Sequence, residues 1–127
     1  NHRFGLDSGV LIKDNHIAAA GSIGAALERA RRLAPHTFRI EIECETLAQV
    51  EQAVAHGATS ILLDNMALDD LRDARKIVGD AVLLEASGNV NLDTVRAIAE
   101  TGVDLISVGA LTHSVKAVDL SMRIEAV

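Results

Sequence analysis

The stretch Ser60-Ile61-Leu62-Leu63-Asp64-Asn65 decides the fold, because it is a short unbroken apolar run that ends in two polar residues. A continuous apolar run of this length is typical of a strand that is buried on both faces of a parallel sheet. Apolar residues with helical spacing precede it over residues 47–54 and follow it over residues 68–78. Helix, strand and helix therefore alternate here, which indicates a parallel α/β arrangement.

The same alternation extends outward to both ends of the chain. The later apolar runs begin near residues 60, 82 and 104, so a strand, its loop and its helix take about 22 residues. We expect a parallel β/α barrel of the TIM type, and an incomplete one, since about five strand-helix units cannot close an eight-stranded barrel. The expected strands are residues 10–12, 38–43, 60–63, 81–84 and 105–108, and the expected helices cover 23–33, 47–54, 68–78 and 92–99.

Local signals agree with these helices. Ser22 and Asn91 are suited to cap helix N-termini with a side-chain oxygen. Gly57, Gly79 and Gly102 follow helical runs, where a residue with positive φ commonly ends a helix. No Gly-x-Gly-x-x-Gly follows the first strand, which argues against a dinucleotide-binding fold.

The composition fits a tightly layered α/β core. Of 127 residues, 49% are hydrophobic, with no Trp, no Tyr and two Phe, so the core must consist of Ala, Val, Ile and Leu. Cys44 is the sole cysteine, which excludes an internal disulfide and suggests a reducing compartment. No apolar run approaches the roughly 18 residues of a membrane span, and we expect a cytoplasmic protein.

Residues 1–127 are expected to form one partial barrel domain. Asn1 is not an initiator methionine, and we expect the chain to be a piece of a longer protein. The net charge of −6 argues against a nucleic-acid binder. Residues 1–39 hold six Lys/Arg and three acidic residues, whereas residues 40–127 hold six and fifteen. That division suits an anionic substrate and a metal ion, although ordinary surface charge explains most of these residues.

Charged residues stand at the ends of the expected strands, where parallel barrels place their active sites. Glu43, Asp64 and Glu85 are spaced 21 and 21 residues apart, which predicts carboxylates at similar heights on three consecutive strands. Such oxygen ligands suit Mg²⁺, which keeps several waters and shares substrate phosphates. Glu41 lies two residues before Glu43 and so faces the same side of its strand. Structural salt bridges with nearby cations are the alternative.

Lys13 ends the first expected strand and has three possible uses: a Schiff-base nucleophile, a clamp for a substrate carboxylate, or a structural partner of an acid. A nucleophilic amine needs a lowered pKa, which neighbouring carboxylates oppose. The acidic surroundings therefore favour a charged, anion-binding Lys13. His2 and Arg3 lie just before this strand and are further candidates for binding an anion.

Two short turns of small residues are candidates for phosphate binding. Ser87-Gly88-Asn89 and Val108-Gly109-Ala110 each connect an expected strand to a helix. Such turns leave backbone N–H groups free near the positive end of a helix dipole. A pair of them on neighbouring strands can hold one phosphate. His113 lies in the last loop and could add a hydrogen bond, while Ser114 is equally suited to cap a helix.

Several stretches together resemble the quinolinate phosphoribosyltransferase family, also called nicotinate-nucleotide pyrophosphorylase (carboxylating). They occur in the family's order over nearly the whole chain, and the string Leu11-Ile12-Lys13-Asp14-Asn15-His16-Ile17 is highly specific. The other matching stretches are Asn1–Leu6, Ile40–Glu43, Leu62–Met66, Leu84–Asn89, Thr101–Asp104 and Ser107–His113.

The resemblance implies the barrel portion of an enzyme that joins quinolinate to phosphoribosyl pyrophosphate with Mg²⁺, yielding nicotinate mononucleotide, pyrophosphate and CO₂. It implies a homo-oligomer, a dimer or a multiple of dimers, that acts on small molecules and binds neither nucleic acid nor membrane. By resemblance, His2, Arg3 and Lys13 hold the quinolinate carboxylates, Glu43 and Asp64 face the ribose and the metal, directly or through water, and Ser87, Gly88, Asn89, Val108, Gly109, Ala110 and His113 bind the 5′-phosphate.

The chain also departs from the family pattern. The family's N-terminal α/β domain and a basic Thr-Pro-Gly segment on the first barrel strand do not occur here, and we expect this chain alone to have little activity. Asn89 stands where many members have a second glycine. Two alternatives remain: an enolase-like enzyme with three metal-binding carboxylates and Lys13 as base, and an inactive barrel fragment that serves only in assembly.

Overall fold

A computed structural model describes residues 5, 7–114 and 116–125. Five parallel strands form one sheet in which each strand pairs with the next along the chain. This sequential order differs from that of doubly wound sheets and is the order of a β/α barrel. The strands are β1 (Gly9–Ile12), β2 (Arg39–Cys44), β3 (Ser60–Asp64), β4 (Leu83–Ser87) and β5 (Leu105–Ile106).

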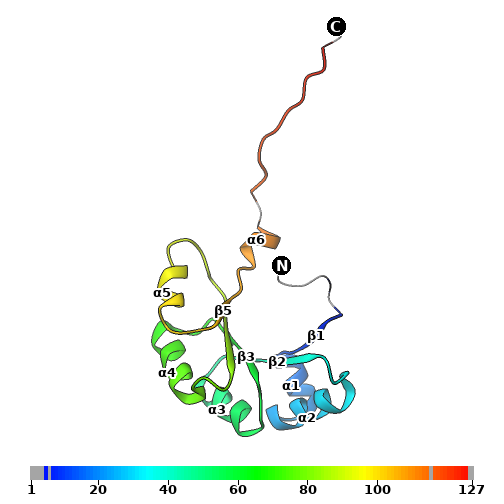
Figure 1. The fold of residues 1–127 in the computed structure, drawn as a ribbon, viewed down its shortest axis with the longest axis vertical. Coiled ribbons are helices and arrows are strands. Elements are labelled where there is room, and N and C mark those ends of the chain that lie inside the picture. Colours follow the sequence, from blue (N-terminus) through cyan, green and yellow to red (C-terminus); the bar gives the residue numbers. More distant parts are fainter. Residues whose placement is uncertain (1–4, 6, 115, 126–127) are drawn as a thin grey trace.

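All helices but the last, at residues 110–113, lie along the outer side of the curved sheet, and the last lies apart from them beyond the end of the fifth strand (Figure 1). Within the described residues the sheet does not close, so β1 and β5 each have one unpaired edge. The expectation of an incomplete barrel with five strand-helix units is therefore confirmed. The helices are α1 (Asp14–Ala20), α2 (Ile23–Leu33), α3 (Leu47–Ala55), α4 (Leu68–Val78), α5 (Val95–Ala99) and α6 (Ala110–His113).

The core lies between the sheet and helices α1 to α5. Successive strand residues point to opposite faces, and the outward-facing Ile42, Ile61 and Leu84 are each 0% exposed. Most of the core consists of Ile, Val, Leu and Ala, as the composition predicted. Polar residues of the strands are thereby restricted to the inner, concave face.

Several element boundaries differ from those the sequence predicted. β4 begins at Leu83 and continues to Ser87, because its pairing with β3 extends to the polar end of both strands. Leu92 is 94% exposed and precedes α5 instead of packing under it. Asn91 does not cap α5 itself; its side-chain oxygen accepts from the Asp93 and Thr94 N–H groups in the preceding turn.

Helix α1 was not predicted, because its alanine-rich sequence has no strong apolar period. It begins after Lys13 and ends at Gly21, which has a φ of 91°. The other helix signals, apart from Asn91, are confirmed. Ser22 Oγ accepts from the Ala25 N–H at 3.1 Å, and the three glycines predicted to end helices, at positions 57, 79 and 102, all have positive φ.

Among the described residues, no helix has the length and apolar character needed to cross a membrane. Residues 116–125 follow α6 as an exposed segment without helix or strand, and they run away from the sheet (Figure 1).

Arg75 joins α4 to the amino-terminal edge of the sheet. Its guanidinium donates to the carbonyl oxygens of Gly102 at 2.9 Å and Gly79 at 2.6 Å, and it forms an ion pair with Asp104. The Asp104 carboxylate also accepts from the Leu84 N–H at 2.8 Å. This backbone hydrogen bond, together with Arg75, lowers the pKa of Asp104. The Asp104 carboxylate thus holds β5, a strand of only two residues, against β4.

We predict that Asp104→Asn destabilises the domain in a pH-dependent manner. The folded-state pKa of Asp104 is lowered, so its contribution is present above the unfolded pKa of about 3.9 and is lost as pH falls through the folded value. Asp104 is 45% exposed, so solvent screening limits the effect to about 1 kcal/mol near pH 7. Urea unfolding between pH 2 and 7 measures it, and the difference between the two proteins should shrink toward acid pH.

Asp69→Asn is the matched control, because Asp69 pairs with Arg72 at 2.7 Å on the outer surface of α4 but is 93% exposed. Exposed i,i+3 pairs contribute about 0.5 kcal/mol or less. Equal destabilisation by the two substitutions would contradict the role given to Asp104.

Candidate functional site

Lys13 and Glu43 form an ion pair where β1 and β2 end. The Lys13 Nζ lies 3.2 Å from Glu43 Oε2, and Glu43 is only 9% exposed whereas Lys13 is half exposed. The register explains the contact. Ile12 pairs with Ile42, and Lys13 and Glu43 are the residues that directly follow this pair on the two strands. A nearly buried carboxylate is therefore compensated by a cation that still reaches solvent.

Glu43 raises the pKa of Lys13, first through the side-chain hydrogen bond and then through its charge, and the charges of Asp64 and Asp14 add to the effect. The amine is therefore protonated at neutral pH. A protonated amine is not a nucleophile. Of the three uses considered for Lys13, the structure thus disfavours the Schiff base and shows the pairing with an acid. The role of Lys13 in binding a substrate anion stays a prediction.

His16 fixes the backbone at Lys13, a contact that sequence reasoning missed. The Lys13 N–H donates to His16 Nδ1 at 2.9 Å, and the His16 N–H donates back to the Lys13 carbonyl at 2.9 Å. The His16 side chain thereby supplies one half of a capping box at the start of α1, and the second bond is an ordinary backbone hydrogen bond of the first turn. The signal was present as the three-residue spacing, but Lys and His are unusual residues for this motif.

The carboxylates of Glu43, Asp64 and Glu85 do not lie at one height, and that prediction was wrong. Glu43 pairs across the sheet with Leu62, and Leu62 pairs with Glu85. Asp64 lies one inward-facing layer further along, level with Ser87. Equal sequence spacing failed as a guide because the connections between these strands differ in length.

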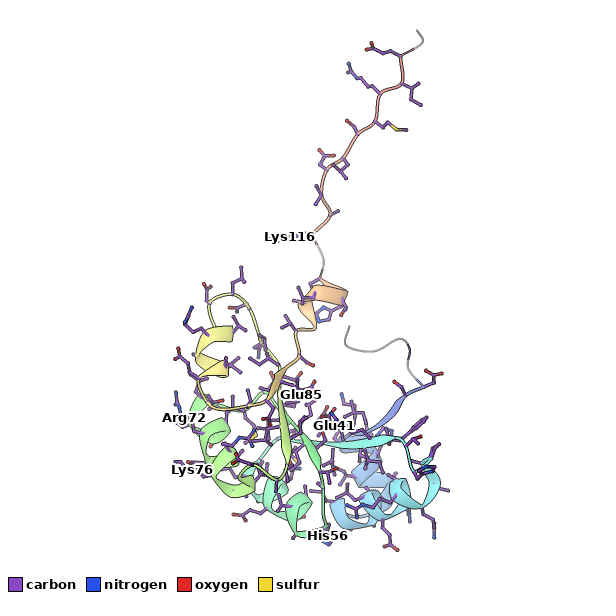
Figure 2. All side chains as sticks on the ribbon, viewed as in Figure 1. Glu41, His56, Arg72, Lys76, Glu85 and Lys116 are labelled. Carbon is purple, nitrogen blue, oxygen red and sulfur yellow. The ribbon has the colours of Figure 1, made fainter. Side chains whose placement is uncertain are left out.

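Two carboxylates of the concave face, those of Glu85 and Glu41, accept hydrogen bonds from serine hydroxyls. Glu85 is 6% exposed and accepts a hydrogen bond from Ser107 Oγ, and Glu41 accepts from Ser60 Oγ at 2.8 Å. Both belong to the strands at the centre of the molecule (Figure 2). They line a hollow of about 600 Å³ over the inner face of the sheet.

The two turns predicted to bind phosphate meet in one pocket. A cavity of about 460 Å³ lies between the end of β4 and the segment from β5 to α6. Of the six residues of these two turns, Val108 alone does not line the cavity. Its side chain packs against the core, so only its backbone could serve the pocket. The lining residues are Ser87, Gly88, Asn89, Val90, Asn91, Ser107, Gly109, Ala110 and His113.

The remaining predictions have different outcomes. His2 and Arg3 lie outside the described residues. Cys44 is fully buried, and burial raises the pKa of its thiol to about 12, with a further contribution from Glu43, so it is an unreactive core residue. Within the described part of the chain, no group of three or more His, Cys, Asp or Glu residues is arranged to hold a metal ion. The enolase-like alternative requires three carboxylates at one site, whereas Asp64 is level with Ser87, two residues beyond the level of Glu43 and Glu85.

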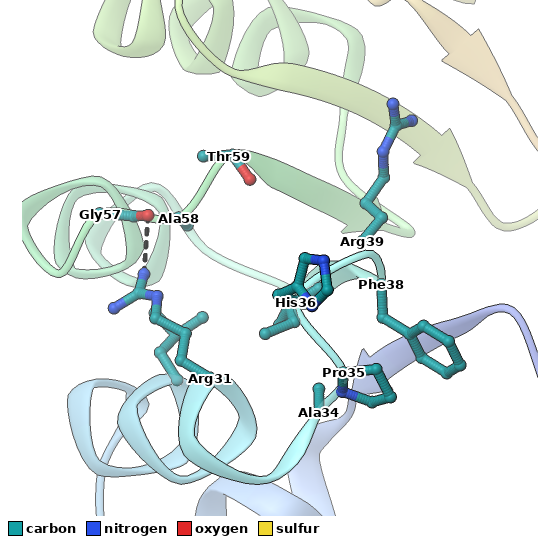
Figure 3. A pocket seen from close by; sticks show the side chains of 11 residues that line it. Arg31, Ala34, Pro35, His36, Phe38, Arg39, Gly57, Ala58 and Thr59 are labelled. Atoms are coloured by element: carbon teal, nitrogen blue, oxygen red, sulfur yellow. Dashed lines mark hydrogen bonds between the residues drawn. The ribbon is translucent and has the colours of Figure 1, made fainter.

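A separate pocket of about 250 Å³ lies at the opposite, amino-terminal edge of β2 and β3 (Figure 3). Arg31 points toward the end of α3 there and donates to the carbonyl oxygens of His56 and Gly57, both at 2.7 Å. This arginine thus satisfies carbonyl groups at a helix C-terminus. In parallel barrels the amino-terminal edge serves stability and the opposite edge serves binding.

Comparison with known proteins agrees with the geometry. The model of the family described as quinolinate phosphoribosyl transferase, C-terminal domain, matches residues 1–123. The probable nicotinate-nucleotide pyrophosphorylase (carboxylating) of Bacillus subtilis is 48% identical over 124 residues, which cover 98% of this chain and 43% of that protein. The relative from Synechocystis sp., with the same name, is 46% identical over 127 residues, again 98% of this chain and 43% of that protein.

Solved structures give the same result. The nicotinate-nucleotide pyrophosphorylase from Francisella tularensis superposes with a TM-score of 0.86 at 45% identity, over 95% of this chain and 43% of that one. The chain thus spans less than half the length of the relatives it matches. With a family model over nearly all its residues, the chain belongs to the quinolinate phosphoribosyl transferase family and corresponds to its C-terminal domain.

Proposed function

We propose that the protein containing this chain transfers the phosphoribosyl group of phosphoribosyl pyrophosphate to quinolinate and releases CO₂ from the product. The observation that carries the proposal is the arrangement at one edge of the sheet. A charged lysine paired with Glu43, a carboxylate at Asp64 and a two-loop pocket all lie at the carboxyl ends of β1 to β5. A substrate with a phosphate at one end and a reacting carbon at the other can span this edge.

Lys13 supplies charge for an anionic substrate. Its ammonium is half exposed, and its pairing with Glu43 keeps it protonated. A carboxylate of quinolinate can accept a charge-assisted hydrogen bond from it. His2 and Arg3 are proposed to bind the same substrate, by their resemblance to the family motif.

The two-loop pocket is proposed to bind the 5′-phosphate. Gly88 has a φ of 95°, which lets the backbone turn sharply directly after β4. Gly109 precedes α6 and exposes its backbone to the same cavity. His113 adds a polar ring close to Gly109 in the same cavity. Backbone N–H groups and one imidazole suit the oxygen atoms of a phosphate monoester.

In the reaction, the pyridine nitrogen of quinolinate attacks the anomeric carbon, and the bond to pyrophosphate breaks with its electron pair leaving on oxygen. Positive charge develops at the anomeric carbon and can be stabilised by the carboxylates of Glu43 and Asp64. The bond between the ring carbon next to the nitrogen and its carboxylate then breaks, and CO₂ leaves. The electron pair stays on that carbon, where the positive charge of the quaternised nitrogen stabilises it, until the carbon takes a proton from water. No side chain has to act as general acid or base.

Mg²⁺ is part of the proposal. Glu43 and Asp64 supply hard oxygen donors from neighbouring strand ends, and Mg²⁺ commonly takes one or two carboxylates, waters and substrate phosphates. These residues fit such a shared site, with Asp64 the freer of the two because Glu43 already pairs with Lys13. When bound, the ion would neutralise the departing pyrophosphate.

We also propose a cytoplasmic homo-oligomer, a dimer or a multiple of dimers. A buried cysteine with no second thiol fits a reducing compartment. The family resemblance implies that basic residues reach the substrates across a subunit interface, which an oligomer would provide.

We predict that Lys13→Ala weakens quinolinate binding by about tenfold or more, because a charge-assisted hydrogen bond is lost. Calorimetric titration of the protein that contains this chain, with and without Mg²⁺, measures the effect. The matched control is Lys76→Ala, which removes an exposed lysine paired with Asp73 at 2.8 Å on α4. Wild-type affinity in Lys13→Ala would remove this residue from the quinolinate site.

We predict that Gly88→Ala raises the KM for phosphoribosyl pyrophosphate. A Cβ at this position would lie 2.2 Å from Asn65 Oδ1, and the φ of 95° is unfavourable for alanine. The phosphate loop must therefore shift. Gly79→Ala is the control, since its φ is also positive, at 58°, but a Cβ there meets no atom within 4 Å. Steady-state kinetics should show a KM rise of about tenfold for the first variant and none for the second, which should lower only the melting temperature.

A further inference from the structure

Asn65 and Asn89 are the two non-glycine residues with positive φ in the described part of the chain, at 53° and 51°. Such backbone conformations cost free energy for residues other than glycine and tend to occur at functional sites. Asn65 directly follows β3, and Asn89 ends the turn after β4. Both left-handed residues therefore stand at the carboxyl edge of the sheet, beside the proposed phosphate pocket.

The side chains of the two asparagines contact each other, and Asn65 also contacts Asp64. Asn89 Nδ2 donates to Asn65 Oδ1 at 3.0 Å, and Asn65 Nδ2 donates to Asp64 Oδ2 at 2.9 Å. An amide has one acceptor end and one donor end. Because Asn89 supplies a donor, it fixes the Asn65 carbonyl toward itself and so directs the Asn65 amino group at the carboxylate.

A backbone hydrogen bond reinforces the linked side chains of Asn89, Asn65 and Asp64. The Asn65 N–H donates to the Ser87 carbonyl at 2.9 Å. The Asn65 amide also lies directly against Gly88, where any Cβ would come within 2.2 Å of Oδ1. The loop after β3 is thus joined to the loop after β4 through a backbone hydrogen bond, a close packing contact and an amide pair.

We propose that Asn65 and Asn89 are positioning residues that couple the phosphate loop to the Asp64 carboxylate. This proposal rests on the proposed function. Asn89 lines the proposed phosphate pocket, and its side chain binds Asn65 in the loop after β3. One substrate molecule, phosphoribosyl pyrophosphate, must engage the loop with its 5′-phosphate and Asp64 at its reacting carbon. The amide chain holds these two contact points in a fixed relation.

The first test compares Asn89→Gly with wild type in steady-state kinetics of the protein that contains this chain. Glycine keeps the backbone N–H and favours positive φ, so the melting temperature should not fall. Loss of the side-chain donor should lower kcat about three- to tenfold and leave the KM for quinolinate unchanged. Asn89→Asp should lower kcat further, because its carboxylate repels Asn65 Oδ1 and reverses the amide. An unchanged kcat in Asn89→Gly would overturn the proposal.

Asn65→Gly and the double variant separate coupling from independent effects. If both asparagines act through one chain, the double variant should be no worse than Asn65→Gly alone. Additive losses would overturn the coupling. Gln52→Gly, on the exposed face of α3, is the control for stability, because it should lower the melting temperature without lowering kcat.

A second readout does not depend on activity. Inorganic phosphate is titrated into the protein while the side-chain carboxyl ¹³C resonance of Asp64 is followed, with Asp64→Asn identifying the signal. Coupling predicts a phosphate-dependent shift that falls by at least about half in Asn89→Gly, although phosphate still binds. No shift in wild type, or the same shift in both, would overturn the proposal.

Failure of wild type to form nicotinate mononucleotide would instead overturn the proposed function, and the phosphate titration would then decide the coupling alone.

Discussion

The burial of one face of the parallel sheet beneath its helices determines where every polar group of the site can lie. Ile42, Ile61 and Leu84 are fully buried against the helices. Because side chains alternate along a strand, their neighbours Glu43 and Glu85 must point to the concave face. Charged side chains on a short sheet are thus gathered on one side without any specific attraction among them. Their costs of burial are met by local partners, namely Lys13 and Ser107.

The site therefore has two parts with different physical characters. At the ends of β1 to β3, charged side chains dominate, and the Lys13 ammonium stays protonated because carboxylates surround it. At the ends of β4 and β5, small residues expose the backbone to a pocket. The proposed substrate, phosphoribosyl pyrophosphate, has a reacting carbon between two charged ends and would need both kinds of surface, one to balance charge and one to approach closely. Asn65 and Asn89 lie where the two parts join.

Stabilising contacts and the proposed site lie at opposite edges of the same sheet. Arg75 and Asp104 connect α4, β4 and β5 at the amino-terminal edge. Arg31 does the same for α2 and the end of α3. Both arginines satisfy backbone carbonyl groups, and the contacts of Arg75 and Asp104 also secure the short strand β5. The carboxyl edge is consequently free to hold left-handed asparagines and nearly buried carboxylates, arrangements that would otherwise weaken the fold.

The sequence by itself determined the parallel strand-helix order, the helix-ending glycines and the candidates at the strand ends, since these follow from local periodicity and turn chemistry. The specific Leu-Ile-Lys-Asp-Asn-His-Ile string indicated the family. Only the tertiary structure decided which strand-end residues meet: Lys13 with Glu43, Asp64 a layer away, and Asn89 with Asn65. Register depends on the lengths of the connecting loops and helices, and amide contacts depend on left-handed backbone conformations. Neither is set by the spacing of residues along the chain, so neither could be read from it.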